Sequence, residues 1–297
     1  MGRLTAIVLG SAAGGGFPQW NCRCPACELA WSGDPRARSR TQASLAVSAG
    51  DGWILINASP DLREQIRNTP ALHPQTGSRG SPIRAVLLTG AEIDQITGLL
   101  SLREGTPFEL YATSSTHAAM AANTMFAALS SVTEREVSLG ERFTVHGIEA
   151  ELFAVPGKAP LYLEAGDPAL DAEGEVNVGI ELRRGPARLL FVPGAARVSE
   201  AMRPRLAQAD VILFDGTLYT DDEMLRLGVG TKTGRRMGHM PVAGENGSLA
   251  ALSGVAGRRI YIHINNTNPI HILGSSERSA VEAAGWQIAE DGMEIVL

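Results

Sequence analysis

The sequence lacks a long apolar run: no interior stretch of its 297 residues approaches the roughly 18 apolar residues that a membrane-spanning helix needs. It also lacks a basic surplus, because 26 Lys and Arg stand against 32 Asp and Glu. A nucleic-acid groove requires a concentrated basic face, so we expect no nucleic-acid partner. The apolar run Leu4–Leu9 is too short for the hydrophobic region of a signal peptide and predicts a strand instead. We therefore expect chemistry on a small molecule or peptide in the cytoplasm, by a protein that is not embedded in a membrane.

Cysteine is scarce as well, and its placement is informative. All three cysteines, Cys22, Cys24 and Cys27, lie within the segment NCRCPACELA. Spacings this tight do not satisfy disulfide geometry comfortably, and an odd count leaves one thiol over. The cluster resembles three corners of a tetrahedral zinc site. We predict a structural zinc loop over residues 20–30, with a fourth ligand from elsewhere in the chain.

Two acidic residues follow an apolar run in the first half of the chain. Val86–Thr89 predicts a buried strand and Ile96–Glu104 a core-facing helix, with Glu92 and Asp94 between them. Carboxylates at the carboxyl end of a strand lie where open α/β sheets place their ligands, and they suit a divalent metal. Taken alone, the two acids are better interpreted as ordinary helix caps.

The second half of the chain repeats this pattern with histidines. Asp215 follows the apolar strand Val211–Phe214, His239 lies in the segment GVGTKTGRRMGHMP, and His263 ends the apolar run RRIYI-HINN. A lone core histidine usually only donates a hydrogen bond to a carbonyl. Because two histidines and two acids follow separate strands, we predict that Asp94, Asp215, His239 and His263 form a catalytic metal site, with Glu92 as a further ligand.

The chain has only two lysines, Lys158 and Lys232. Because lysine is so scarce, a lysine that only carries surface charge is less expected here than usual. We interpret Lys158 as a candidate contact for an anionic substrate group, with an exposed loop lysine as the alternative. The acidic turn over residues 167–176 is a candidate lid.

Several long motifs then occur in order: GSAAGGGFPQWNCRCPAC, INASPDLR, LLTGAEIDQITGLLSLREG, VPGKAPLY, LFDGTLYTDDEM, GVGTKTGRRMGHMP and IHINNTNP. Together they resemble the pyrroloquinoline quinone (PQQ) biosynthesis protein B family of the metallo-β-lactamase superfamily, nearly from end to end. The resemblance implies one domain over residues 1–297 with an α/β, four-layer αββα sandwich. Two mixed sheets would face each other, helices would cover both outer faces, and metal would lie at the sheet edge.

The chain departs from the superfamily at the two-metal loop. The pattern His-x-His-x-Asp-His here reads Gly90, Glu92, Asp94 and Gln95, although similar proteins generally keep the last histidine. A binuclear zinc hydrolase site is therefore not expected, since most of its nitrogen ligands are missing. The remaining donors, His239, His263 and Asp94, offer two imidazoles and a carboxylate with open positions, which suits a non-haem iron that activates dioxygen.

The resemblance implies an iron-dependent hydroxylase that adds oxygen to the tyrosine of a cross-linked Glu-Tyr precursor, alongside other PQQ biosynthesis proteins and with a homodimer left open. His239 is either a metal ligand or a proton donor. Two other functions remain alternatives: a carrier that assists transport of PQQ or its precursor to the periplasm, and a zinc phosphodiesterase. For the fourth zinc ligand, Asn266 stands where a related phosphodiesterase has histidine, and His271 follows nearby.

Overall fold

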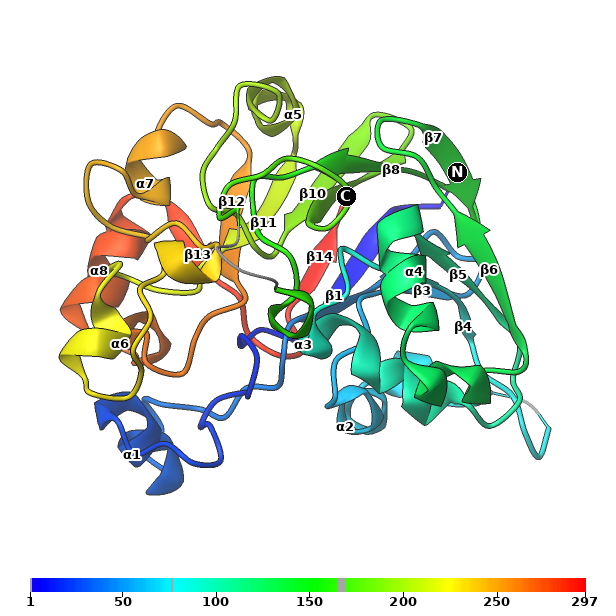
Figure 1. Cartoon of the computed structure of the whole chain (residues 1–297), viewed down its shortest axis with the longest axis horizontal. Helices are drawn as coiled ribbons and strands as arrows, with labels where there is room; N and C mark the ends of the chain where they lie inside the picture. The colour runs from blue at the N-terminus through cyan, green and yellow to red at the C-terminus, as the bar shows by residue number, and fades with distance from the viewer. Residues whose placement is uncertain (1, 76, 165–168) are drawn as a thin grey trace.

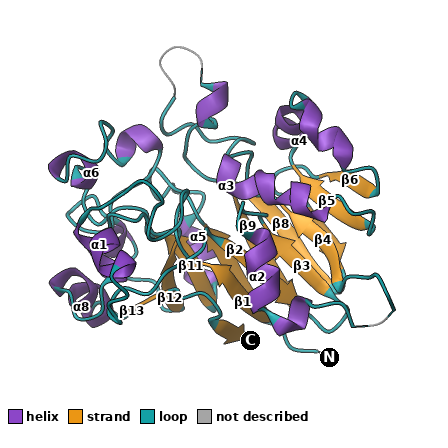
Figure 2. Cartoon of the chain, turned by 90° about the horizontal axis from the view of Figure 1, so that it is seen from below, coloured by secondary structure: helices purple, strands orange, loops and turns teal. Residues whose placement is uncertain are grey.

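The computed structural model describes residues 2–75, 77–164 and 169–297, so residues 167 and 168 of the expected acidic turn lie outside the described residues. Within the described chain, two seven-stranded sheets lie against each other with helices on their outer sides (Figures 1 and 2). This is the four-layer αββα sandwich that the motifs predicted.

The strands of the first sheet, in spatial order, are β14 (Glu294–Val296), β1 (Thr5–Gly10), β2 (Ser44–Ser48), β3 (Trp53–Ile56), β4 (Ile83–Leu87), β5 (Phe108–Ala112) and β6 (Val132–Glu136). Those of the second are β13 (Trp286–Ile288), β12 (Arg258–Ile262), β11 (Val211–Asp215), β10 (Ala187–Val192), β9 (Val178–Arg184), β8 (Ile148–Ala154) and β7 (Arg142–Val145). Both sheets are mixed: strands β3 to β6 run parallel in the first, and β10 to β13 run parallel in the second.

The core lies between the two sheets because side chains alternate along each strand. In β1, Ala6 and Val8 pack into the inner core with residues of the second sheet such as Ile180. Their neighbours Ile7 and Leu9 instead pack against the helices outside. This period of two is what a sheet covered on both faces requires, and it makes the register of β1 unambiguous.

Helices cover both outer faces. The first sheet is covered by α2 (Leu62–Asn68), α3 (Ile93–Ile96) and α4 (Ser114–Ala121), and the second by α5 (Arg203–Gln208), α7 (Ser248–Ala251) and α8 (Ser276–Ala283). At one end, α1 (Pro25–Trp31) lies beside α6 (Glu223–Arg226) and α8 in both views (Figures 1 and 2). Short 3₁₀ turns are η1 (Pro70–Leu72), η2 (Thr97–Leu102), η3 (Thr124–Ala128), η4 (Leu161–Leu163), η5 (Arg235–Met237) and η6 (Pro269–His271). No helix in the described part of the chain is both long and apolar enough to cross a bilayer.

The structure corrects the helix expected over residues 96–104. The α-helical turn begins earlier, at Ile93, and passes into the 3₁₀ turn η2 at Thr97. The cause lies at Gly98, whose N–H donates to the carbonyl of Ala58 at 2.8 Å instead of continuing the helical ladder. A Cβ at this position would come within 2.0 Å of the Ser59 carbonyl oxygen, so the turn is fixed by its packing against the segment before α2.

A buried carboxylate holds the start of α6. Glu223 is 3% exposed; its Oε2 accepts a hydrogen bond from the backbone N–H of Tyr219 at 2.8 Å, and its Oε1 accepts one from the Thr267 hydroxyl. Burial raises the pKa of Glu223 to about 7, because desolvation outweighs these hydrogen bonds. A raised carboxyl pKa means that the group favours the folded state only while it is protonated.

We therefore expect the stability of Glu223→Gln, relative to that of the native chain, to rise as the pH rises through about 7. The native side chain's contribution is full below its unfolded pKa near 4.5 and is lost as the pH rises through about 7. At about 1.4 kcal/mol per pKa unit, the gain is at most about 3 kcal/mol. Urea unfolding at mildly acidic and mildly alkaline pH measures it. Glu200→Gln, whose side chain is 90% exposed, is the control. A gap between variant and native protein that does not change with pH would contradict the prediction.

Candidate metal centre

Four ligand-type side chains converge where strands of both sheets end. Asp215 is the last residue of β11, His263 directly follows β12, and Asp94 lies in the first turn of α3 after β4. His239 comes from the loop after η5. One donor atom each from Asp215, His239 and His263 lies within 4.8 Å of the others, a spacing that could hold a metal ion. Asp94 joins the group through His263.

Each imidazole is held by a carboxylate. Nδ1 of His239 lies 2.7 Å from Oδ2 of Asp215, and Nε2 of His263 lies 3.0 Å from Oδ2 of Asp94. The two rings stack with their centroids 5.3 Å apart. Asp215 is completely buried, and the other three side chains are 13–18% exposed. Metal-binding histidines characteristically have one ring nitrogen fixed by a carboxylate, which orients the ring. His239 fits this pattern through Asp215, whereas both ring nitrogens of His263 are engaged, with Asp94 and Thr217.

Thr217 connects the group, and the sequence analysis did not single it out. Its hydroxyl donates to Oδ1 of Asp215 at 2.6 Å, and its oxygen lies 2.8 Å from Nδ1 of His263 and 3.0 Å from the His263 carbonyl oxygen. The backbone of His263 is left-handed, with φ of 58°, a strained conformation for a residue with a side chain. The only sequence signal for Thr217 was a hydroxyl residue two positions after a strand-end acid.

The electrostatics favour ionised carboxylates. Burial acts to raise the pKa of Asp94, but the hydrogen bond and charge of His263 and the charge of His239 outweigh it, so the pKa is lowered. The same balance, with His239 as the main partner, lowers the pKa of Asp215. Burial opposes the charged form of His263, yet Asp94 raises its pKa. One completely buried and one largely buried carboxylate facing two imidazoles are a donor set that fits a divalent cation.

The group opens into a pocket of about 440 Å³. Its wall includes Glu92, Gln95, Lys158 and Lys232. Glu92, which the sequence suggested as a ligand, faces Lys158, with 3.3 Å between Oε1 and Nζ. Burial raises the pKa of Glu92, and Lys158 offsets only part of that effect. Gln95 closes a capping box at the start of α3, because its Oε1 accepts a hydrogen bond from the Glu92 N–H at 3.0 Å.

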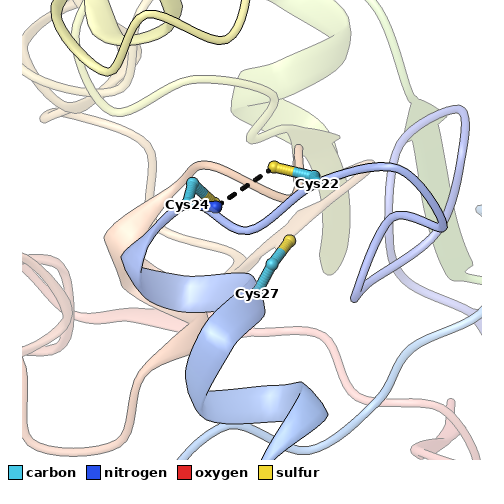
Figure 3. Close-up of side chains that lie close together, drawn as sticks. All are labelled: Cys22, Cys24 and Cys27. Carbon is cyan, nitrogen blue, oxygen red and sulfur yellow. Dashed lines mark hydrogen bonds between the residues drawn. The ribbon is translucent and has the colours of Figure 1, made fainter.

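The three cysteines form a second cluster. Figure 3 shows Cys22 and Cys24 on the loop before α1 and Cys27 on the helix, pointing toward that loop. Their sulfur atoms lie within 4.8 Å of one another, and all three residues are buried. The hydrogen bond between Cys24 and Cys27 lowers the pKa of Cys27 to about 6 and raises the pKa of Cys24. Because thiolates at this spacing are zinc ligands, the cluster fits the ion that the sequence predicted.

Of the two candidates for a fourth ligand, Asn266 lies beside the sulfur atoms. Its side-chain Nδ2 is 3.3 Å from Sγ of Cys27, and its backbone carbonyl oxygen is 3.6 Å from Sγ of Cys24. His271 stacks on Phe17 with 4.1 Å between ring centroids and directs Nε2 toward the Ile264 carbonyl. Asn266 thus lies at the cluster, where its side-chain amide donates a hydrogen bond to Cys27 and only its backbone carbonyl oxygen is placed as an acceptor.

Known proteins resemble this chain over nearly its whole length. The beta-lactamase superfamily domain matches residues 52–264. Coenzyme PQQ synthesis protein B of Methylobacterium sp. (strain 4-46) is 56% identical over 99% of this chain and 100% of its own length. The same protein of Ruegeria pomeroyi is 52% identical over 98% of this chain and 99% of its own length.

Solved structures extend the comparison to the fold. A crystal structure of Zn²⁺-bound PqqB from Methylobacterium extorquens matches with a TM-score of 0.97 and 52% identity, covering 99% of this chain and 100% of that one. A diphosphatase of the PhnP family shares the fold with a TM-score of 0.69 at 22% identity, covering 99% and 97% of the two chains. The chain therefore belongs to the coenzyme PQQ synthesis protein B family, within the β-lactamase superfamily.

Proposed function

We propose that Asp94, Asp215, His239 and His263 bind one divalent metal, iron in the active protein, and that the centre hydroxylates the tyrosine ring of the cross-linked Glu-Tyr precursor of PQQ. Iron bound there would supply the activation of dioxygen. The observation that supports the proposal is the combination of two imidazoles and two ionised carboxylates at the base of a pocket large enough for a small molecule.

The chain's own residues prepare this site. Asp215 fixes the ring of His239, and Asp94 fixes that of His263. Both histidines line the pocket, and His239 has the more exposed side chain, at 18% against 13%, so it serves either as a ligand or as the donor of a proton to the substrate. The cysteine cluster would hold a structural zinc that fixes the loop before α1. The protein would work in the cytoplasm with the other proteins of PQQ biosynthesis.

Gln95 supports a single catalytic metal. Its amide oxygen is engaged with the Glu92 N–H, and Glu92 itself faces Lys158. Neither side chain is therefore directed to a second metal next to Asp94. This arrangement differs from that of a binuclear hydrolase, and it argues against phosphodiester hydrolysis as the reaction.

An oxygen-consumption assay tests the function. The protein is purified without oxygen, loaded with iron, and mixed with the Glu-Tyr precursor, dioxygen and a reductant. We expect iron-dependent consumption of oxygen and a precursor that is heavier by the added oxygen. Zinc-loaded protein is the inactive control. The absence of turnover with full iron occupancy would refute the proposal, and tight binding of PQQ without oxidation of the precursor would favour the carrier function.

A further inference from the structure

The two lysines of the chain both line the pocket, but they differ in their surroundings. The ammonium group of Lys158 is enclosed, and its side chain is 9% exposed. It lies 2.9 Å from Oε1 of Glu164, 3.0 Å from the Ala159 carbonyl and 3.3 Å from Oε1 of Glu92. Two of its N–H donors form hydrogen bonds, with Glu92 and Ala159, and its charge is paired with that of Glu164. Lys158 is therefore committed to the protein.

The charges around Lys158 also cancel. The second oxygen of Glu164 pairs with Arg236 at 3.1 Å, so two cations stand beside two carboxylates. Gly238 keeps the loop close to Lys158, because a Cβ there would come within 3.1 Å of Cγ of the lysine. A cluster that is neutral and closely packed shapes the pocket wall and offers little attraction to a charged ligand.

Lys232 lies in different surroundings. It is half-buried, on the loop between α6 and η5, and it lines the same pocket as His239 and His263. Among residues 2–75, 77–164 and 169–297 its ammonium group forms neither an ion pair nor a hydrogen bond, whereas Lys158 and Arg236 do both. Within the described pocket, Lys232 is thus the cation whose charge and donors are left for a ligand.

We propose that the ammonium group of Lys232 binds a carboxylate of the substrate, so that the pocket selects an acidic small molecule. The inference rests on the proposed function, because the Glu-Tyr precursor carries the carboxylates that Lys232 would bind. It moves the contact with the anionic substrate from Lys158, where the sequence alone suggested it, to the other lysine. A charge-assisted hydrogen bond at a partly desolvated pocket wall gives both affinity and orientation.

Calorimetry on the full-length, zinc-loaded protein tests this without turnover. The ligands are the Glu-Tyr precursor and its methyl ester, in which the carboxylates are blocked. For Lys232→Met we expect affinity for the acid to fall by about 10- to 100-fold, as for one lost charge-assisted hydrogen bond. Lys232→Met and the native protein should bind the ester with equal affinity. Lys232→Arg should retain most of the native affinity for the acid. Arg235→Met removes an exposed charge three residues away and should change nothing.

The results separate the inference from the proposed function. Equal binding of the acid to native protein and to Lys232→Met overturns the inference, and so does a loss that appears only in Lys158→Met. Binding of the ester to Lys232→Met shows that the variant's pocket is intact. If the acid depends on Lys232 for binding but iron-loaded protein does not hydroxylate it, the proposed function fails while the inference stands.

Discussion

Asp215→Asn is expected to remove the catalytic metal and with it the hydroxylation of the precursor. The completely buried carboxylate accepts hydrogen bonds from the backbone N–H groups of Ala195 and Thr217, the Thr217 hydroxyl and Nδ1 of His239, all within 3.0 Å. An asparagine would place an NH₂ group against at least one of these donors. Metal affinity should fall at least about 100-fold, and the free energy of unfolding by about 3–5 kcal/mol.

Metal content after dialysis and urea unfolding at neutral pH measure these two effects. Asp51→Asn is the matched control, because it makes the same chemical change at a side chain that is 82% exposed, and it should behave as the native protein does. A variant at position 215 that retains one exchangeable iron per chain and turns over the precursor would show that Asp215 has no part in the centre.

Cys27→Ser should abolish the structural zinc and lower stability by a comparable amount. Cys27 is completely buried on α1, and a serine hydroxyl does not ionise to become a ligand as a thiol does. An ion that binds only the folded chain stabilises it by about 4 kcal/mol when its free concentration is a thousand times its Kd. Zinc analysis after treatment with a chelator, together with urea unfolding in the presence and absence of zinc, measures both losses.

The zinc-free native protein is the reference for this experiment. The native chain should lose stability when zinc is removed, and Cys27→Ser should lose clearly less, because only the group of Asp215, His239 and His263 is then left to bind the ion. If added zinc stabilises the serine variant as much as the native protein, the cysteines do not form the site.

Much of the fold could be predicted from local patterns. Apolar runs located the strands of the two inner layers, and the positions of Asp215 and His263 directly after such runs indicated their common edge. The charged strand β6 was missed, because VTERE at the exposed edge of the first sheet buries too little to show a pattern. The short strands β13 and β14 were missed as well, since three residues do not establish alternation.

The candidate site was less predictable than the fold, because its polar partners are distant in sequence. Spacing alone offered Glu92 and Asp94 equally. Because α3 begins at Ile93 and Gln95 caps it, Asp94 contacts His263 whereas Glu92 contacts Lys158. The enclosure of Lys158 likewise depends on contacts of the folded chain, such as the one with Glu92, and the sequence pattern does not show them. Thr217 was missed for the same reason, because its hydroxyl contacts His239 and His263 only in the folded chain.

The two clusters differ in how far apart their members lie along the chain, and this bears on the order of folding. Cys22, Cys24 and Cys27 are on one short segment, so three ligands of the proposed zinc site lie close together before either sheet exists. The contact of His263 with Asp94 spans 169 residues and joins the two halves of the sandwich. Loop closure of that length comes late. Binding of the proposed catalytic ion would thus report that folding is complete, whereas the three thiols would already lie close together in a chain arrested halfway.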